Sequence, residues 1–160
     1  MTEDKAKSTK SNKKNKKKPK KPNLRKLVKK AFSLWSECSR ILRNDRCEYC
    51  GIQNREINSH GKPTVLNVHH LVGRENKALR FDLRNACVLC TDHHKFGKDS
   101  AHKGSIFFYE WFRNYRPDDY WYLINNRDGD PVDTVEKVQA VIDDLKATKE
   151  RLTKVNSNGL

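Results

Sequence analysis

Apolar residues recur at helical spacing near both ends of the chain. Between residues 24 and 43, Leu27, Ala31, Trp35 and Cys38 mark one side of the segment, and most of the Lys and Arg residues fall on the other side. This pattern predicts an amphipathic helix that lies against the core. A second stripe predicts a helix from residue 133 to about residue 152, opened by a capping box of Asp133 and Glu136.

Two short segments in the middle of the chain are typical of strands. Residues 65–70 alternate, contain β-branched residues and end in two histidines, and residues 86–89 form an apolar run. We expect an antiparallel hairpin joined by a long loop. A short helix can begin at Thr91, with Thr91 or Asp92 capping its first amides and Gly97 ending it, so the predicted order is strand, strand, helix.

An aromatic stripe follows this unit. Residues 106–115 predict a helix that ends before Pro117 and contributes to the core, and residues 118–123 predict a short turn. His60 and His102 are expected to be loop residues rather than ligands, although His102 could contact phosphate near a helix start.

Charge is concentrated at the N-terminus. The chain of 160 residues has a net charge of +14, and its first thirty residues hold thirteen lysines and Arg25 against only Glu3 and Asp4. Residues 1–23 have almost nothing apolar to bury, so we expect a disordered basic tail. It would bind nucleic acid through phosphate contacts, the alternative being a solubilising leader. The lysines singled out for this contact are Lys13, Lys14, Lys16, Lys17 and Lys18.

Some classes of protein are disfavoured by composition. No window holds the eighteen or more apolar residues of a membrane span, and the N-terminus lacks the apolar stretch of a secretory signal. We therefore expect no membrane partner and a cytoplasmic protein, in the bacterial host cytoplasm if a phage encodes it. In that reducing compartment, the five cysteines indicate metal binding rather than disulfides.

Four residues have the spacing of a zinc knuckle. Cys47 and Cys50 form a CxxC pair, and Cys90 with His93 forms a CxxH pair, which together offer four soft ligands for tetrahedral Zn²⁺. Cys87 is a rival fourth ligand. We prefer His93 because a regular strand would point Cys87 to the face opposite Cys90.

A second group carries candidate chemistry, namely His69, His70, Asn85 and His94. Phosphodiester hydrolysis needs a base that takes a proton from water and a cation that neutralises developing charge. We predict that His70 is the general base and that His69 and His94 bind a catalytic Mg²⁺, Mn²⁺ or other divalent cation. Asn85 would brace the loop by bonding backbone near His70. Arg74, Arg80 and Arg84 could clamp DNA phosphates.

The segment from Cys47 to His94 resembles the HNH endonuclease family. The shared pattern is CxxC, a strand ending in a histidine pair, an Asn before an apolar strand, and a closing LCxxCH, here Leu89-Cys90-Thr91-Asp92-His93-His94. From Leu34 to Leu123, the chain is more loosely similar to phage-encoded HNH proteins, including the NinG-like recombination proteins. The chain departs from the common form at His93, where a Cys usually stands, and at His69, where many members have Asp.

The resemblance implies an α+β fold with a ββα-metal core and a zinc knuckle, flanked by helices. We expect a nuclease domain over residues 24–128, with residues 129–160 forming a C-terminal helix that packs on it or extends it. The implied function is metal-dependent hydrolysis of DNA that leaves 5′-phosphate and 3′-hydroxyl ends. Two alternatives stay open: a non-catalytic zinc module that binds DNA, and a structure-selective junction nuclease. Target specificity and oligomeric state have no signal in the sequence.

Overall fold

The computed structural model describes residues 23–157, and it combines helices with one small sheet. The α-helices are α1 (Leu24–Leu42), α2 (Ile106–Tyr115), α3 (Pro117–Asn126) and α4 (Val135–Ser157). The strands are β1 (Leu66–His70) and β2 (Ala86–Cys90), and the shorter turns are η1 (Leu83–Asn85), η2 (Asp92–Phe96) and η3 (Ala101–Lys103). The fold is therefore of the mixed α+β class, as expected. The predicted basic tail lies outside the described residues.

The two strands pair in antiparallel fashion, as predicted. Leu66 lies opposite Cys90, and His70 lies opposite Ala86. Because side chains alternate along a strand, His69 shares one face with Cys87, its partner, and His70 shares the other face with Ala86. The register therefore sends the two adjacent histidines to opposite sides of the sheet.

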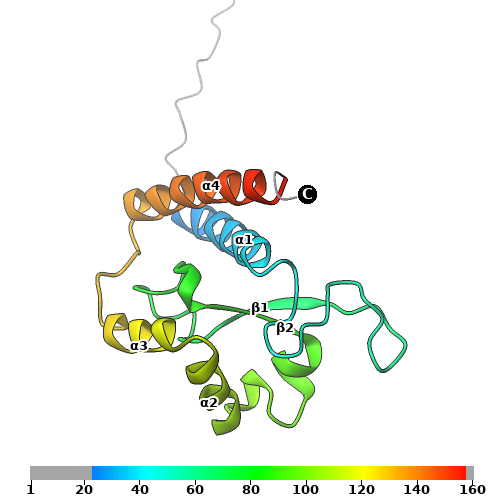
Figure 1. Cartoon of the computed structure of the whole chain (residues 1–160). Coiled ribbons are helices and arrows are strands. Elements are labelled where there is room, and N and C mark those ends of the chain that lie inside the picture. The colour runs from blue at the N-terminus through cyan, green and yellow to red at the C-terminus, as the bar shows by residue number, and fades with distance from the viewer. Residues whose placement is uncertain (1–22, 158–160) are drawn as a thin grey trace, which may run out of the picture.

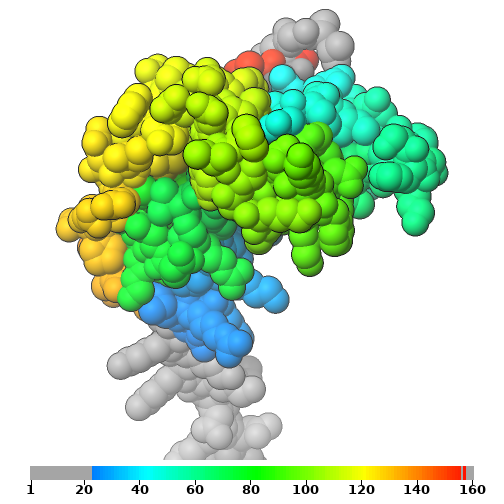
Figure 2. Space-filling view, turned by 90° about the horizontal axis from the view of Figure 1, so that it is seen from below, coloured from blue at the N-terminus to red at the C-terminus, as the bar shows by residue number. Residues whose placement is uncertain are grey.

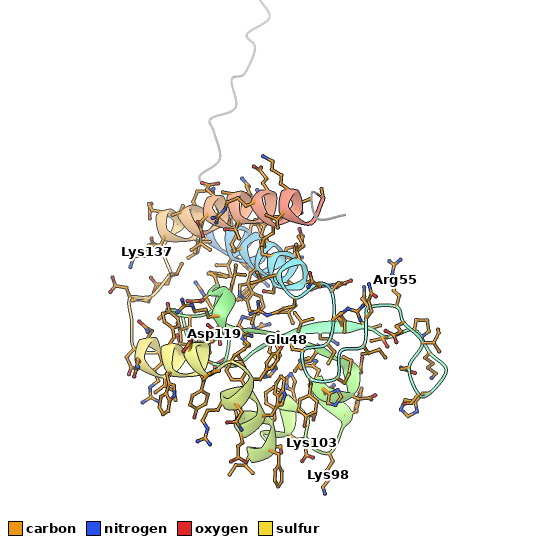
Figure 3. The ribbon with its side chains drawn as sticks, in the orientation of Figure 1. Glu48, Arg55, Lys98, Lys103, Asp119 and Lys137 are labelled. Atoms are coloured by element: carbon orange, nitrogen blue, oxygen red, sulfur yellow. The ribbon has the colours of Figure 1, made fainter. Side chains whose placement is uncertain are left out.

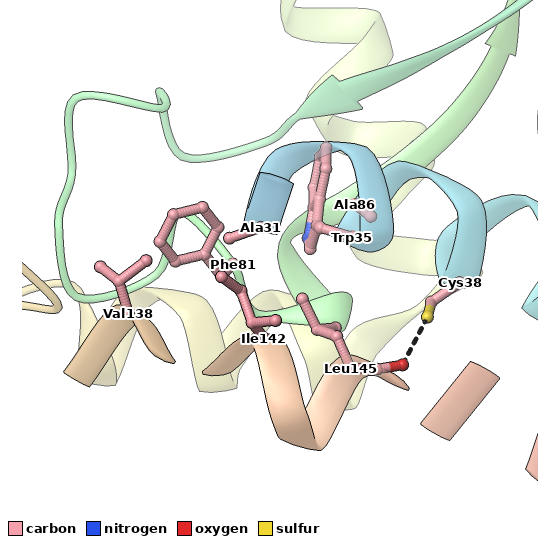
Figure 4. Close-up of a cluster of buried hydrophobic side chains, with 8 residues drawn as sticks. All are labelled: Ala31, Trp35, Cys38, Phe81, Ala86, Val138, Ile142 and Leu145. Carbon is pink, nitrogen blue, oxygen red and sulfur yellow. Dashed lines mark hydrogen bonds between the residues drawn. The ribbon is translucent and has the colours of Figure 1, made fainter. Parts of the chain in front are cut away.

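Helices α1 and α4 pack together on the Ala86 side of the hairpin (Figure 1). Their shared core places Trp35 and Ala31 of α1 against Ile142 and Val138 of α4, all of them buried (Figure 4). The Cys38 thiol donates a hydrogen bond of 3.2 Å to the Leu145 carbonyl and so joins the two helices. This packing positions Trp35 against His70 at the end of β1.

The opposite face of the hairpin is covered by α2 and the turns before it. Phe108 of α2 is fully buried and packs with Cys87 and Leu89 of β2. A further small cluster joins Phe112 of α2 to Leu123 of α3 and thereby fixes the angle between these helices. No helix within residues 23–157 is long and apolar enough to cross a membrane.

Three local predictions need correction. Residues 117–126 form a full helix rather than a short turn, since Pro117 occupies a first-turn position where its missing N–H costs nothing. Thr91 does not cap η2, because its hydroxyl donates to the Val65 carbonyl at 3.2 Å. At the start of α4 the capping oxygen belongs to Thr134, which accepts from the Lys137 amide, while Asp133 pairs with Lys77.

Candidate metal centres

Three cysteines and one histidine converge between the knuckle and the start of η2. The ligand atoms of Cys47, Cys50, Cys90 and His93 all lie within 4.8 Å of one another. His93 Nδ1 is 3.1 Å from Cys90 Sγ and 3.9 Å from Cys47 Sγ, and the Sγ atoms of Cys50 and Cys90 are 4.0 Å apart. Tetrahedral zinc separates such ligands by about 3.3–3.8 Å, given bonds of about 2.3 Å to sulfur and 2.0–2.1 Å to nitrogen. The cluster can hold a metal ion such as zinc.

The knuckle is shaped by backbone hydrogen bonds around Gly51. The Gly51 amide donates to the Cys47 carbonyl at 2.8 Å, and the Cys47 amide donates to the Ile52 carbonyl at 2.9 Å. Gly51 has φ +77°, a left-handed conformation that favours glycine. The turn places both cysteines of the CxxC pair on the same side, as a metal knuckle requires.

Tyr49, which lies between the knuckle cysteines, orients the histidine ligand. Its ring stacks on that of His93, with centroids 4.3 Å apart and an interplanar angle of 21°. Trp111 of α2 packs against the Tyr49 ring, with centroids 4.6 Å apart. The stack therefore fixes the His93 ring with Nδ1 toward the thiols.

The thiols are electrostatically coupled to one another. A hydrogen bond from Cys90, reinforced by one from His93, lowers the pKa of Cys47 to about 3. The same hydrogen bond to Cys47 raises the pKa of Cys90, and burial raises the pKa of Cys50. The site thus favours thiolate character at Cys47, the form in which sulfur binds metal. A pocket of about 530 Å³ lined by Cys50, Cys90 and His93 gives solvent access to the cluster.

Cys87 does not join this cluster. It is fully buried, and burial raises the pKa of its thiol well above the ordinary value. It lies three positions before Cys90 on β2, so regular alternation turns it to the other face. Cys38 is likewise buried, between α1 and α4.

Three histidines form a second cluster on the other side of the hairpin. The ligand nitrogens of His69, His94 and His102 lie within 4.8 Å of one another, and the Nε2 atoms of His94 and His102 are 3.0 Å apart. Bonds of about 2.0–2.1 Å to one ion at about 90–110° would set nitrogens about 3.0–3.4 Å apart. We call this group the histidine triad. It brings together His69 and His94, the two residues predicted to share an ion.

His102 was expected to be a loop residue, and its place in the triad is a correction. The turn η3 carries it back toward His94, and this path is fixed by Ser100, whose hydroxyl donates to the Lys95 carbonyl at 3.0 Å. Ser100 and Ala101 are buried, while Gly104 follows with φ +62°. In the sequence, the signal was His102 with two small residues, Ser100 and Ala101, before it and Gly104 after it, just ahead of an aromatic helix.

The surroundings of the triad favour the neutral form of His69 and His94. Burial, with smaller contributions from the neighbouring histidines, lowers the pKa of His69 to about 3. Burial also lowers the pKa of His94, with His102 adding to the effect. The Nε2 atom of His69 is buried and has no hydrogen-bond partner among the described residues. A buried nitrogen without a partner costs free energy, which an ion in the triad would offset.

The turn η2 supplies one ligand to each cluster. It is a π-helical turn in which the Gly97 amide donates to the Asp92 carbonyl at 2.7 Å. The wide turn carries the adjacent His93 and His94, one contacting the thiols and the other the triad. A zinc ion in the first cluster would therefore also hold the backbone that presents His94.

His70 lies outside the triad, on the α1 side of the sheet. Its ring stacks on Trp35, with centroids 4.0 Å apart, and meets Phe32 edge-on at 5.7 Å. Nε2 is 3.0 Å from the Arg80 carbonyl oxygen, which can only accept, so Nε2 carries the proton and Nδ1 keeps its lone pair. Burial lowers the pKa of His70, which favours this neutral form.

Asn85 braces the loop that follows β1. Its Nδ2 donates to the Val72 carbonyl at 2.9 Å and to the Leu79 carbonyl at 3.1 Å, and its Oδ1 accepts from the Val72 amide at 2.7 Å. Its own carbonyl accepts from the Leu71 amide at 3.0 Å. The fully buried side chain thus closes the loop next to His70.

The three arginines predicted to clamp DNA differ in availability. Arg80 is partly buried, donates to the Val132 carbonyl and lies 4.9 Å from the centre of the Phe81 ring, so part of its guanidinium is already engaged within the fold. Arg84 lies 3.6 Å from Asp119 and over the Tyr122 ring. Arg74 is exposed beside Phe32. The predicted lysine contacts of the tail fall outside the described residues.

Comparison with known proteins adds no assignment: no family model matches the chain, and neither a curated protein nor a solved structure matches it.

Proposed function

We propose that this chain is a metal-dependent endonuclease of the HNH type that hydrolyses phosphodiester bonds in DNA. The observation that carries the proposal is the histidine triad, held between an antiparallel hairpin and the turns after it, in which His69 Nε2 is buried without a hydrogen-bond partner among the described residues. A nearby Cys₃His cluster that shares η2 with the triad supports the same reading. The basic tail supports DNA as the partner.

The triad has the donor set of a site for a divalent cation. His69, His94 and His102 offer three imidazole nitrogens, a donor set that suits zinc and other transition metals better than Mg²⁺. The ion would supply positive charge to the scissile phosphate and to the departing 3′ oxygen. His69 is fixed by its strand and His94 by η2, so the two ligands come from elements already held by the fold.

We assign the general base to His70. The Arg80 carbonyl holds Nε2–H, and Trp35 holds the plane of the ring, so Nδ1 stays available to take a proton from water. Asn85 keeps the loop that carries this carbonyl closed. Since β1 sends His69 and His70 to opposite faces, the attacking water would lie at the end of the strand, where both faces meet.

A plasmid-nicking assay tests both assignments. Zinc-loaded protein with added Mg²⁺ or Mn²⁺ should nick supercoiled DNA, and His70→Ala should lower the rate by about 10²–10⁴-fold because general-base catalysis contributes that much. His94→Ala should abolish nicking through loss of the ion. His60→Ala is the matched control, since His60 is exposed and belongs to neither cluster. Unaltered nicking by His70→Ala would assign the base elsewhere.

A second candidate is a zinc-stabilised protein that binds DNA without cutting it. It is favoured by the Cys₃His cluster and the basic tail, neither of which requires catalysis. It predicts a shift of DNA on a native gel and no nicking with any divalent metal. Ends carrying 5′-phosphate and 3′-hydroxyl groups would rule it out.

A further inference from the structure

The segment between His94 and Phe108 exposes large apolar side chains beside the triad. Phe96 has 63% of its surface exposed, Ile106 74% and Phe107 62%. Phe96 is two residues after His94, and Phe107 precedes Phe108, whose ring centre is 6.1 Å from that of His69. These exposed apolar side chains lie on the stretch of chain that supplies two of the triad histidines, which favours a binding surface over chance exposure.

The same segment is cationic. Lys95, Lys98 and Lys103 are exposed, and within residues 23–157 none of them pairs with a carboxylate. Lys103 Nζ donates to the Phe96 carbonyl at 3.1 Å, and Lys95 Nζ lies 5.5 Å from the centre of the Phe96 ring. Lys98 and Lys103 extend from the lower edge of the molecule in Figure 3. Positive charge therefore surrounds the exposed aromatic ring.

We propose that residues 95–107 form a platform on which unpaired bases of single-stranded DNA stack, next to the phosphate at the triad. The inference rests on the proposed function and names its substrate class. Phe96 and Phe107 would stack on bases, and the three lysines would contact the adjoining phosphates. Aromatic faces among cations are the combination that binds single strands, because every base has a face to stack and every link a phosphate.

The charge distribution favours nucleic acid over a protein partner as the occupant. Figure 2 shows the start of α1, the segment near residues 70–80 and the segment near residues 95–110 on one face. The start of α1 carries the exposed cations Arg25, Lys26, Lys29 and Lys30. A face with so many cations attracts a polyanion and opposes the docking of a second basic copy of this chain.

Binding measured without cleavage tests the platform. Fluorescence anisotropy would compare a labelled oligo(dT) with a duplex of the same phosphate number, using zinc-loaded protein without added Mg²⁺ or Mn²⁺. Phe96→Ala and Phe107→Ala should each weaken binding of the single strand by roughly 5- to 150-fold, as expected for loss of one stacked base. Duplex binding should change less than about twofold. Phe96→Tyr should retain binding, whereas Phe96→Leu, apolar but unable to stack, should not.

Trp121→Ala is the matched aromatic control, since Trp121 is 55% exposed on α3 outside the segment. For charge, Lys103→Gln should reduce the slope of log affinity against log salt by about 0.7, as for one lost phosphate contact on a single strand. Lys62→Gln, in an exposed loop, should leave the slope unchanged.

Three outcomes would overturn the platform: unaltered single-strand binding by both Phe variants, equal loss on duplex and single strand, or a dimer that Phe107→Ala dissociates. The last would make the apolar surface an interface between copies. Plasmid nicking stays a separate readout, because failure of the platform leaves nicking by the wild type intact. Conversely, a chain that stacks single strands but never nicks would retain the platform and lose the proposed nuclease.

Discussion

Arg116 and Glu48 form an ion pair in the interior of the molecule. Arg116 Nη1 is 3.1 Å from Glu48 Oε2, and only 10% and 2% of the two side chains are exposed. Glu48 belongs to the zinc knuckle, and its other oxygen accepts from the Val88 amide of β2 at 2.8 Å. Arg116, between α2 and α3, also donates to the Ala86 carbonyl at 2.8 Å. The pair therefore ties the knuckle, the hairpin and the α2–α3 corner together.

Breaking this pair should destabilise the whole domain. Glu48→Gln would remove the carboxylate that Arg116 and Arg43 share, at 3.1 and 3.2 Å. Arg116 would keep Asp119 as a partner at 2.7 Å, so we expect a cost of about 1.5–3 kcal/mol, as for lost hydrogen bonds to charged groups. Urea unfolding followed by circular dichroism measures the loss. Glu110→Gln is the control, because its pair with Arg113 is exposed and spans 3.8 Å, so about 0–1 kcal/mol is expected. Similar costs for both variants would contradict a structural role for Glu48.

Asn85 should be as sensitive as the ion pair. Asn85→Ala leaves the Val72 amide and two carbonyls unsatisfied in a buried place, for a cost of about 2–4 kcal/mol. Asn85→Asp keeps the acceptor for the Val72 amide but sets a carboxylate oxygen against the Leu79 and Val72 carbonyls. Asn58→Ala, which removes bonds within an exposed loop, should cost about 1 kcal/mol or less. Unfolding midpoints of the three variants, measured at equal zinc content, check whether the loss of stability is larger at Asn85 than at Asn58.

Much of the architecture could be predicted from periodicity. The bounds of α1, β1, β2 and α2 follow from apolar spacing and from Pro117, because these features act within a few residues. The four residues of the Cys₃His cluster were predicted from spacing, and the choice of His93 over Cys87 from strand alternation. These inferences needed no knowledge of distant contacts.

The residues that the sequence did not reveal depend on contacts between distant segments. His102 joins the triad only because η3 turns back toward η2. Arg80 and Arg74 look alike in the sequence, because both are arginines in the loop between the strands, but Arg80 donates to the distant Val132 carbonyl. Alternation along β1 also separates His70 from His69, which the adjacency of the two in sequence conceals. The nicking assay therefore tests whether a base and a metal ligand on opposite faces of β1 act on one phosphate.

The ion pair of Glu37 and Lys149 should make the stability of the fold depend on pH. Lys149 Nζ lies 2.6 Å from Glu37 Oε2, and this hydrogen bond lowers the pKa of Glu37 below its ordinary 4.5. A carboxyl whose pKa is lowered by folding adds stability above its unfolded pKa and loses it as pH falls through the folded pKa. Glu37→Gln should therefore lower the melting temperature slightly at pH 7, because the pair is half exposed. The difference from wild type should vanish below the folded pKa; a constant difference would refute the linkage.

Removal of the metal should divide the cysteines into two classes by the reactivity of their thiols. With zinc bound, Cys47, Cys50 and Cys90 should react slowly with a thiol reagent even though Cys50 is exposed, because bound thiolates are poorly available. A strong chelator should release the zinc of the Cys₃His cluster and make these three thiols reactive, while Cys38 and Cys87 stay protected until the chain unfolds, since both are buried. Cys87→Ala should retain the zinc content of the wild type, whereas His93→Ala should lower the zinc affinity of the Cys₃His cluster by at least about tenfold through loss of a ligand. Zinc content measured by atomic emission, alongside thiol counting, checks both variants. Loss of zinc from Cys87→Ala with retention in His93→Ala would transfer the fourth ligand to Cys87 and require β2 to twist out of its regular alternation.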